Sequence, residues 1–564
     1  MDNFKKYGLE PAGAVPNKRQ YRHMHYKKAF FHFGVNTFTS LEWGNGTESE
    51  KMFDPTDLDI DQWMRTIKAA GFDLAIITAK HHDGFCLWPS AYTEHSVKNS
   101  PYKNGKGDII REFTDSARKY GIKAGVYISP WDRNSEYWGK PEYSDFYAKQ
   151  LKELMTGYGK LEEVWWDGAG STETVYDWGR WASIIREYQP DAAIFGSLGA
   201  SEYVDLRWVG NEAGYAGETH YASIETHSLV VEDRGELNTG IPGAERYIPA
   251  EVDVSIRPGW FYHSDQDDKV KSVSALNRIW FDSVGRNAIL LLNFPPDRHG
   301  LICETDARNA LLSHRCISRM LAVNYAVGAK ISADSVLGDC IPENAPLDDE
   351  NVFYAAQRDK KSAVIDIMLP EKKKLNVFAV GEEIRLGERI TEFTVESVTD
   401  NGPVLLYSGT SVGFFRAVKI PAGEYGHIRF TVKKALASPV INRLGLYLFE
   451  ESDETVTGGK ADFNLCETPS SKTEISSDRR EATINFGGIF PFDFIRFGTS
   501  IPGEYTVFAF SGTEWYEIAS GKSLSTDVRI NLREKITGSY QIKINSSSPF
   551  SETPGFDVRL KLFS

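Results

Sequence analysis

The chain has 564 residues, a length that predicts about three or four domains of ordinary size. Hydrophobic residues make up 41% and charged residues 25%, which is typical of a globular protein and not of a disordered, fibrous or membrane chain. The net charge of −14, without a long run of Lys and Arg, argues against nucleic-acid binding. No apolar run approaches the roughly 18 residues that cross a bilayer, so we expect no membrane span.

Two further features concern the cellular compartment. The first residues, MDNFKKYGLEP, lack the apolar core of a signal peptide. We therefore expect a soluble protein, cytoplasmic or, if a leader was removed, periplasmic or secreted. The five cysteines are scattered and include no CxxC pair, which argues against a disulfide scaffold and against a cysteine-based zinc site.

Residues 30 to 300 alternate short apolar runs with amphipathic stretches. The runs predict eight β-strands, at 30–35, 72–79, 122–129, 163–167, 192–198, 206–209, 247–256 and 288–294. The amphipathic stretches predict helices, most of them followed by Gly, at 57–70, 107–120, 143–158, 175–188 and 267–284. Near-continuous apolar strands alternating with helices predict a parallel sheet covered on both faces. Because no Gly-rich phosphate loop follows the first strand, we expect a (β/α)8 barrel over residues 1–325.

The second half of the chain has a different composition. Twelve of the 13 tryptophans lie between Trp43 and Trp280. After about residue 325, short β-branched or aromatic segments separated by turn residues predict antiparallel β-sandwiches, with strands at 362–368, 374–380, 404–408, 427–432 and 444–449. A polar stretch at 450–460 indicates a linker. The predicted domains are therefore a catalytic barrel at 1–325, a β-sandwich at 326–449 and a second β-sandwich at 450–564.

Chemically unusual residues lie where the predicted barrel strands end, which is where active sites form in this architecture. Asp167 ends the segment VWWDG, and strand alternation places it on the same inward face as Trp165. Burying an unpaired carboxylate is costly, so Asp167 needs a partner or a chemical task. The structural alternative is a helix N-cap or a salt-bridged core carboxylate.

Paired carboxylates in an aromatic-rich pocket suggest glycoside hydrolysis. One carboxylate attacks the anomeric carbon while a protonated carboxyl group assists departure of the leaving oxygen, and in retaining enzymes the two lie about 5 Å apart. Asp167 is the natural nucleophile, and Glu212 and Glu251 are rival acids. Aromatic rings suit the apolar C–H faces of sugars, and His, Glu and Arg can bind the hydroxyl groups.

Clustered histidines raise the alternative of a metal-dependent hydrolase that uses His81, His82 and Asp83. The HMH segment of His23 and His25 resembles the HxH motif of such barrels. However, these two residues precede the first strand and belong to the opposite, amino-terminal face. Neighbouring histidines on a strand also point apart. We therefore expect no metal site.

Seven segments, in order, carry a resemblance to a known family: HFGVNTFT, EWGNGTE, TAKHHDGFCLWPS, GVYISPWDRN, VWWDG, RWVGNEAG and EVDVSIRPGWFYH. They resemble glycoside hydrolase family 29, the retaining α-L-fucosidases, and within it the subfamily that prefers α-1,3/1,4-linked fucose on branched, Lewis-type glycans. The matches span residues 30 to 295. Residues 325–449 also resemble the galactose-binding-like β-sandwich that follows the barrel in this family.

The resemblance implies a retaining exo-α-L-fucosidase without cofactor, acting on fucosylated oligosaccharides or glycoconjugates. It implies Asp167 as nucleophile and Glu212 as acid/base, with Glu251 as the alternative acid/base. The implied fucose contacts are His32, Glu42 or Trp43, His81, His82, Tyr127, Trp131, Trp165, Arg207 and Trp260.

Other interpretations remain open at the level of sequence. One is a catalytically silent, lectin-like protein on the same fold, and another is a broad-specificity α-L-fucosidase. The long segment between Gly214 and Arg246 is expected to contact the galactose arm of a branched substrate, through Glu218, His220, His227 and Asp233, or to form a flexible surface excursion. The oligomeric state is not predicted.

Overall fold

A computed structural model describes residues 2–169, 174–196, 198–347, 349, 351–451, 472–500, 503–510, 515–523, 526–551 and 556–559. The chain divides into two compact units. The first comprises Met1–Leu58, Asp73–Arg118 and Lys123–Glu450, and the second comprises Asp59–Phe72, Lys119–Ile122 and Glu451–Ser564. The first unit contains the strands of the predicted barrel, and these strands position the candidate functional residues.

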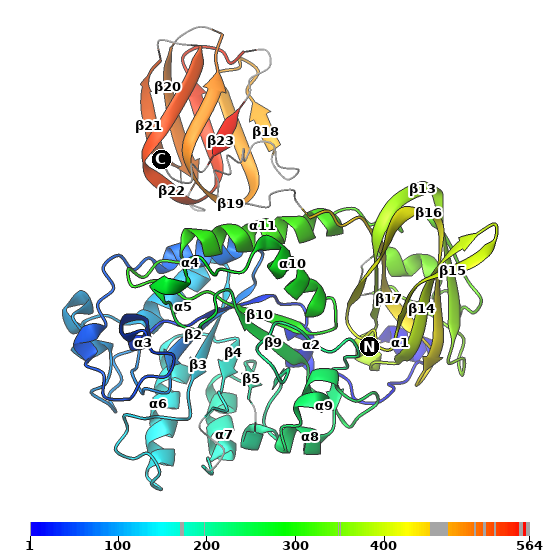
Figure 1. Ribbon diagram of the computed structural model, residues 1–564, viewed down its shortest axis with the longest axis horizontal. Helices are drawn as coiled ribbons and strands as arrows, with labels where there is room; N and C mark the ends of the chain where they lie inside the picture. The colour runs from blue at the N-terminus through cyan, green and yellow to red at the C-terminus, as the bar shows by residue number, and fades with distance from the viewer. Residues whose placement is uncertain are drawn as a thin grey trace. The chain divides into compact units, whose positions relative to one another are not determined.

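Within the described residues, eight parallel strands form the barrel sheet, in the order β5-β4-β3-β2-β1-β10-β9-β6 (Figure 1). Their bounds are β1 (Lys28–Phe31), β2 (Leu74–Lys80), β3 (Lys123–Ile128), β4 (Glu163–Trp165), β5 (Ala193–Phe195), β6 (Arg207–Trp208), β9 (Ala250–Ser255) and β10 (Ile289–Asn293). A parallel bridge between Phe195 and Leu206 joins the two ends of this sheet. All eight predicted strands are confirmed, and nearly every residue in them is buried, as expected for a sheet covered on both faces.

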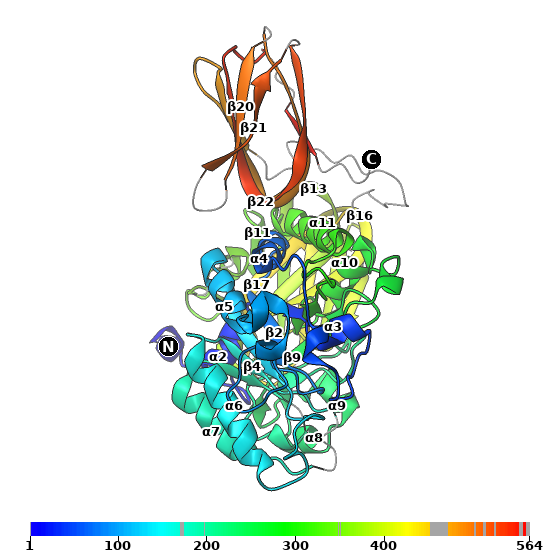
Figure 2. The ribbon, with the colours of Figure 1, turned by 90° about the vertical axis from the view of Figure 1, so that its left-hand side faces the viewer.

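The five predicted helices are present as α4 (Ile60–Ala69), α5 (Ile109–Tyr120), α6 (Tyr143–Gly157), α7 (Trp178–Tyr188) and α10 (Val273–Asp282). Gly71, Gly121 and Gly159 follow three of them with φ of +71°, +67° and +75°. This left-handed conformation suits Gly and ends a helix. Helices α5, α6 and α7 run along the outside of the barrel strands (Figures 1 and 2).

Several elements of the first unit were not predicted. They are α1 (Asp2–Tyr7), α2 (Lys18–His23), α3 (Val35–Thr39), α8 (Thr226–Val230), α9 (Arg234–Thr239), α11 (Glu304–Leu321), β7 (Ser223–Ile224) and β8 (Arg246–Tyr247). The 3-10 helices are η1 (Glu50–Met52), η2 (Val97–Asn99), η3 (Tyr102–Gly105), η4 (Leu198–Ala200), η5 (Ser264–Gln266), η6 (Pro342–Leu347) and η7 (Ile384–Leu386). The connection between β6 and β9, residues 209–249, therefore holds two short helices and a two-stranded antiparallel sheet in place of one barrel helix.

An antiparallel sheet follows the barrel, with the strand order β12-β17-β13-β16-β14-β15 and β11 paired with β13. Its strands are β11 (Lys330–Ala333), β12 (Tyr354–Ala355), β13 (Ala363–Glu382), β14 (Ile390–Thr399), β15 (Gly402–Gly409), β16 (Arg416–Ala435) and β17 (Val440–Tyr447). The two strands predicted at 362–368 and 374–380 are one strand, β13, whose register shifts between Met368 and Lys373. Pro370 lies in this irregular stretch, where a residue without N–H is tolerated.

The second unit holds a further antiparallel sheet, with the strand order β18-β19-β22-β20-β21 and β23 paired with β19. Its strands are β18 (Lys472–Ile475), β19 (Glu481–Gly498), β20 (Glu504–Phe510), β21 (Trp515–Lys522), β22 (Asp527–Ser546) and β23 (Asp557–Arg559). The predicted fold class, a barrel followed by antiparallel β domains, is confirmed. The predicted linker at 450–460 lies largely outside the described residues, and the domain boundaries at 325 and 449 stay predictions.

No helix in the described ranges is both long and apolar enough to cross a membrane.

The 209–249 connection is anchored to the first antiparallel domain by one buried carboxylate. Glu388, which is 2% exposed, accepts hydrogen bonds from the backbone N–H groups of Ala222 (2.9 Å) and Ser223 (3.1 Å) and from Asn287 Nδ2 (2.6 Å). These residues belong to the same compact unit. Glu388 therefore fixes the path of a barrel connection from outside the barrel.

We expect Glu388→Ala to destabilise the protein by about 3 kcal/mol, because it leaves several buried donors without an acceptor. The measurement is the midpoint of thermal unfolding, together with the rate of proteolysis within residues 209–249. Glu424→Ala, which removes an exposed carboxylate from β16 of the same domain, is the matched control. Equal midpoints for the two variants would contradict the anchoring role.

Candidate active site

A pocket of about 290 Å³ lies at the carboxyl ends of the barrel strands. Its lining residues are Phe30, His32, Trp43, His81, His82, Tyr127, Trp165, Asp167, Gly168, Ala169, Phe195, Trp208, Glu212, Glu232, Arg234, Asp253 and Trp260. Both predicted catalytic residues, Asp167 and Glu212, are among them. So are seven of the predicted sugar contacts: His32, Trp43, His81, His82, Tyr127, Trp165 and Trp260.

Asp167 lies just beyond β4 and is held from two sides. Tyr127 Oη donates to Asp167 Oδ2 at 2.9 Å, and the backbone N–H of Ala169 donates to Oδ1 at 2.8 Å. The side chain is 24% exposed, so it faces the pocket and is not enclosed. Burial raises the pKa of the Tyr127 hydroxyl well above its usual range, so this group stays a donor. These two donors hold the carboxyl group of Asp167 in one orientation at the pocket.

His82 presents an unprotonated nitrogen to the pocket. Ser129 Oγ donates to the carbonyl of Trp131 (2.8 Å) and therefore accepts from His82 Nδ1, 2.7 Å away. Burial lowers the pKa of His82, so the neutral ring carries its lone pair on Nε2. That nitrogen lies 3.5 Å from Asp167 Oδ2. A sugar hydroxyl can donate a hydrogen bond to either atom.

His32 and His81 are also neutral. Burial lowers the pKa of His32 to about 4 and that of His81 well below its usual range. Asn293 Oδ1 lies 2.9 Å from His32 Nδ1 and holds that ring in place. His81 stacks on Tyr127 with ring centroids 5.6 Å apart. The pocket histidines are therefore neutral imidazoles, whose ring nitrogens can donate or accept hydrogen bonds.

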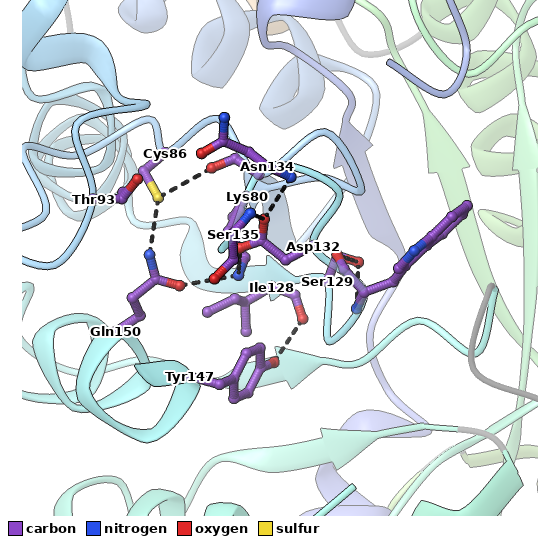
Figure 3. A network of polar contacts seen from close by, with 12 residues as sticks. Lys80, Cys86, Thr93, Ile128, Ser129, Asp132, Asn134, Ser135, Tyr147 and Gln150 are labelled. Carbon is purple, nitrogen blue, oxygen red and sulfur yellow. Dashed lines mark hydrogen bonds and ion pairs between the residues drawn. The ribbon is translucent and has the colours of Figure 1, made fainter. Parts of the chain in front are cut away.

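A polar network behind the pocket holds the loop that follows β3 (Figure 3). The buried Lys80 ammonium contacts Asp132 Oδ2 at 2.9 Å and Gln150 Oε1 at 3.0 Å. Asp132 Oδ1 in turn accepts from the backbone N–H groups of Asn134 (3.1 Å) and Ser135 (2.9 Å). Because every charge in this network is paired, it fixes the loop that carries Trp131.

Trp131 and Glu42 were predicted as sugar contacts, but neither is among the residues that line the pocket. Trp131 packs on His82 (5.0 Å between centroids) and edge-on against Trp43 (5.6 Å). Glu42 accepts from the backbone N–H of Trp260 at 2.9 Å and contacts His263 Nε2 at 2.6 Å. Each of these residues therefore contacts a tryptophan that lines the pocket.

Arg207 does not line the pocket either. The side chain is 1% exposed, and its guanidinium donates to four backbone carbonyls, those of Tyr221, Ala222, Leu237 and Ile248. A guanidinium used in this way has little capacity left for a sugar. The sequence could not show these contacts of Arg207. The carbonyl groups belong to the 209–249 connection, and the sequence does not determine the path of that connection.

Glu251 lies at the amino-terminal end of the barrel, deep below the pocket. It forms a buried ion pair with Lys28 and accepts from Trp165 Nε1 at 3.1 Å. Lys28 also binds Glu163 Oε2 at 2.7 Å. Burial raises the pKa of Glu251 to about 7. Since Glu251 is committed to Lys28 and Trp165, the geometry favours Glu212 as the acid.

Glu212 occupies a different environment from Asp167. It follows β6 in the 209–249 connection, and Trp260 Nε1 donates to its Oε2 at 3.2 Å. Burial raises the pKa of Glu212, the nearby negative charge of Asp167 raises it further, and the Trp260 hydrogen bond opposes both. This setting favours the protonated form of the Glu212 carboxyl group more than water does.

The prediction missed several lining residues, namely Phe30, Phe195, Glu232, Arg234 and Asp253. Asp253 could have been found, since it shares the inward face of its strand with Glu251. Glu232 and Arg234 carry no such signal, because they come from the irregular 209–249 connection.

The four residues of that connection expected to contact a galactose arm do not line the pocket. Glu218 pairs with Arg286 and Arg416, His220 is buried, His227 lies in α8, and Asp233 caps α9.

Among the described residues, His81, His82 and Asp167 form one cluster whose ligand atoms lie within 4.8 Å of one another. Two neutral imidazoles and a carboxylate are donors that could hold a divalent cation. Asp83, which the metal alternative required, instead accepts from the backbone N–H of Phe85 at 2.7 Å. His23 lies at the other end of the barrel, 3.5 Å from Glu163.

Comparison with known proteins identifies the chain. A sequence model described as Alpha-L-fucosidase matches residues 11–314, more than half of the chain. The chain belongs to the α-L-fucosidase family. Alpha-L-fucosidase 1 of Arabidopsis thaliana is 38% identical to this α-L-fucosidase over 432 residues, which cover 74% of this chain and 84% of the relative.

Solved structures agree with this assignment. A putative α-L-fucosidase from Bacteroides thetaiotaomicron has a TM-score of 0.77 at 42% identity, covering 78% of this chain and 99% of its own. A glycoside hydrolase 29 family member from an unknown rumen bacterium covers 98% of this chain and 100% of its own, with a TM-score of 0.71 and 32% identity. A Ruminococcus gnavus GH29 fucosidase in complex with fucose is 31% identical with a TM-score of 0.72, covering 78% of this chain and 96% of its own. This α-L-fucosidase is therefore a glycoside hydrolase of family 29.

Proposed function

We propose that this α-L-fucosidase is a retaining exo-enzyme that releases terminal α-1,3/1,4-linked L-fucose from branched, Lewis-type glycans, with Asp167 as nucleophile and Glu212 as acid/base. One observation supports it most strongly. Two carboxyl groups line one pocket in different environments: Asp167 is oriented by two donors, whereas Glu212 is more exposed, accepts one hydrogen bond from Trp260 and has a raised pKa. A difference of this kind supports Asp167 as the nucleophile and Glu212 as the acid.

The proposed reaction has two steps. Asp167 attacks the anomeric carbon of the fucosyl residue while Glu212 gives its proton to the departing glycosidic oxygen, which forms a fucosyl-enzyme ester and frees the rest of the glycan. A water molecule then gives a proton to Glu212 and attacks the same carbon, which releases L-fucose and restores Asp167. Neither step is routed through a metal or an organic cofactor.

The pocket lining also supports recognition of fucose. We propose that His32, His81 and His82 bind ring hydroxyls as neutral imidazoles. Trp260, whose ring lies 5.0 Å from that of His32, would cover the apolar side of the sugar, together with Phe30 and Trp165. Fucose has a methyl group where related sugars have a hydroxymethyl, so an aromatic wall discriminates by burial.

We assign positioning roles to three predicted contacts. Glu42 orients Trp260, Trp131 supports His82 and Trp43, and Arg207 holds the 209–249 connection through its backbone carbonyls. We also propose the domain division of 1–325, 326–449 and 450–564, with the catalytic residues in the first domain.

The preference for branched glycans is proposed from the outer wall of the pocket. Trp208, Glu232 and Arg234 line it, and the Arg234 guanidinium lies 5.2 Å from the Trp208 ring centroid. An indole face beside a cation and a carboxylate offers both stacking and hydrogen bonding to a second sugar. Family membership argues against the alternative of a catalytically silent lectin.

To test the catalytic roles, we expect Asp167→Gly to lower kcat/KM on an aryl α-L-fucoside about 10³-fold or more. Azide should restore turnover and yield a β-L-fucosyl azide, detected by NMR. Glu212→Ala should keep activity on activated aryl fucosides and lose it on natural glycans, because only the latter need a protonated leaving group. If Glu251→Gln shows that pattern and Glu212→Ala does not, the acid assignment is wrong.

The pH profile tests the environment of Glu212. The Trp260 hydrogen bond lowers the pKa of Glu212, so Trp260→Phe should raise it. A general acid works while protonated and is lost as the pH rises through its pKa, so the alkaline limb of kcat/KM should move to higher pH. Trp208→Phe, which alters another tryptophan of the pocket, should lower kcat/KM without moving the limb. A limb that stays in place in Trp260→Phe would refute the coupling.

For linkage preference, we expect the wild type to release fucose faster from a Lewis-type trisaccharide than from a linear α-1,2-fucoside. Arg234→Ala should lower kcat/KM on the trisaccharide about 10-fold and leave an aryl fucoside unaffected, since only the former reaches the outer wall. The control is Arg246→Ala, which removes an arginine of the same connection that lies outside the pocket. Equal losses on both substrates would contradict this role.

A further inference from the structure

The inward face of β9 presents a carboxyl group that the proposed mechanism does not use. Strand alternation points Glu251, Asp253 and Ser255 to the barrel interior. Glu251 is bound to Lys28 and Trp165, and Ser255 Oγ donates to the carbonyl of Gly259 at 2.7 Å. Asp253 lies between them, is 4% exposed, lines the pocket, and has an Oδ1 atom without a hydrogen-bond partner among the described residues.

The surroundings of Asp253 determine its protonation state. Burial raises the pKa of this carboxyl group well above its usual range, and the neighbouring carboxyl groups of Glu212, Glu251 and Asp167 raise it further whenever they are ionised. The cation beneath this face, Lys28, is already shared between Glu251 and Glu163. Asp253 is therefore a neutral acid, which can donate one hydrogen bond and accept others.

A purely structural role does not explain this arrangement. Leaving a buried polar atom unpaired costs about 1–3 kcal/mol, so carboxyl groups kept for structure have internal partners, as Glu388 and Asp132 do. Asp253 lines a pocket whose other polar lining groups bind a sugar in the proposed function, and its buried Oδ1 has no partner among the described residues. A ligand hydroxyl would supply the missing partner.

We propose that Asp253 is a third functional carboxyl group of this pocket, which binds one ring hydroxyl of the L-fucosyl residue directly. This inference rests on the proposed function and extends it. As a neutral acid, Asp253 adds a donor and an acceptor to the pocket without adding a second anion beside Asp167.

The test uses an aryl α-L-fucoside and its 2-, 3- and 4-deoxy analogues with the full-length protein. Asp253→Ala should lower kcat/KM on the parent substrate about 10- to 100-fold. The loss should shrink to a few-fold on the one analogue that lacks the bound hydroxyl, because the contact is then already absent. Asp253→Asn, which keeps a donor and an acceptor without ionising, should stay within about 5-fold of wild type.

Asp83→Asn is the matched control, since it alters a buried carboxyl group that follows β2 but does not line the pocket. Any loss it causes should be the same on all four substrates. The proposal would be overturned if Asp253→Ala lowered kcat/KM equally on all four substrates or did not lower it at all. The neutral-acid role would be overturned if Asp253→Asn lowered kcat/KM as much as Asp253→Ala. If the alanine variant does not fold, Asp253→Ser carries the same comparison. A wild type without turnover would refute the proposed function itself, and this inference with it.

Discussion

The functional architecture depends on closure of the parallel sheet. Because all eight barrel strands of the described chain run in one direction, closure brings their carboxyl ends to a single rim. Residues as distant in sequence as His32 and Trp260 then line one pocket. The bridge between Phe195 and Leu206 completes the ring next to the short strand β6, and there the regular strand and helix pattern gives way to the irregular 209–249 connection. That connection supplies Glu212, Glu232 and Arg234.

The barrel interior changes in character from the amino-terminal end to the pocket. Lys28, Glu163 and Glu251 form a buried, mutually paired charge cluster at the amino-terminal end, and Trp165 joins it to an aromatic layer in which its ring stacks on Phe195 at 4.0 Å. Above this layer, burial keeps the histidines neutral while Asp167 retains its donors. Burial and pairing therefore change along the barrel interior, so that side chains of the same type have different electrostatic environments.

Groups outside the pocket keep its lining in place. Lys80 and Asp132 fix the loop of Trp131, Glu42 holds the backbone of Trp260, and Glu388 anchors the 209–249 connection from the antiparallel domain. The hydrogen bonds of Lys80, Asp132 and Glu388 are buried, and buried hydrogen bonds hold a geometry more firmly than exposed ones. The antiparallel domain thus takes part in shaping the pocket, because it supplies an acceptor for backbone N–H groups that the barrel connection leaves unpaired.

The sequence by itself determined the eight strands, the main helices and the residues that immediately follow strands, such as Asp167 and His82, because these depend on local periodicity and on one inward-facing side. It did not determine where Arg207, Glu42, Trp131 and Glu251 make their contacts, nor that Glu232, Arg234 and Asp253 line the pocket. Those outcomes depend on the path of an irregular connection and on the depth of each side chain within the barrel. Residue types and spacing determine neither the path of that connection nor the depth of a side chain, so only the tertiary structure decided these contacts.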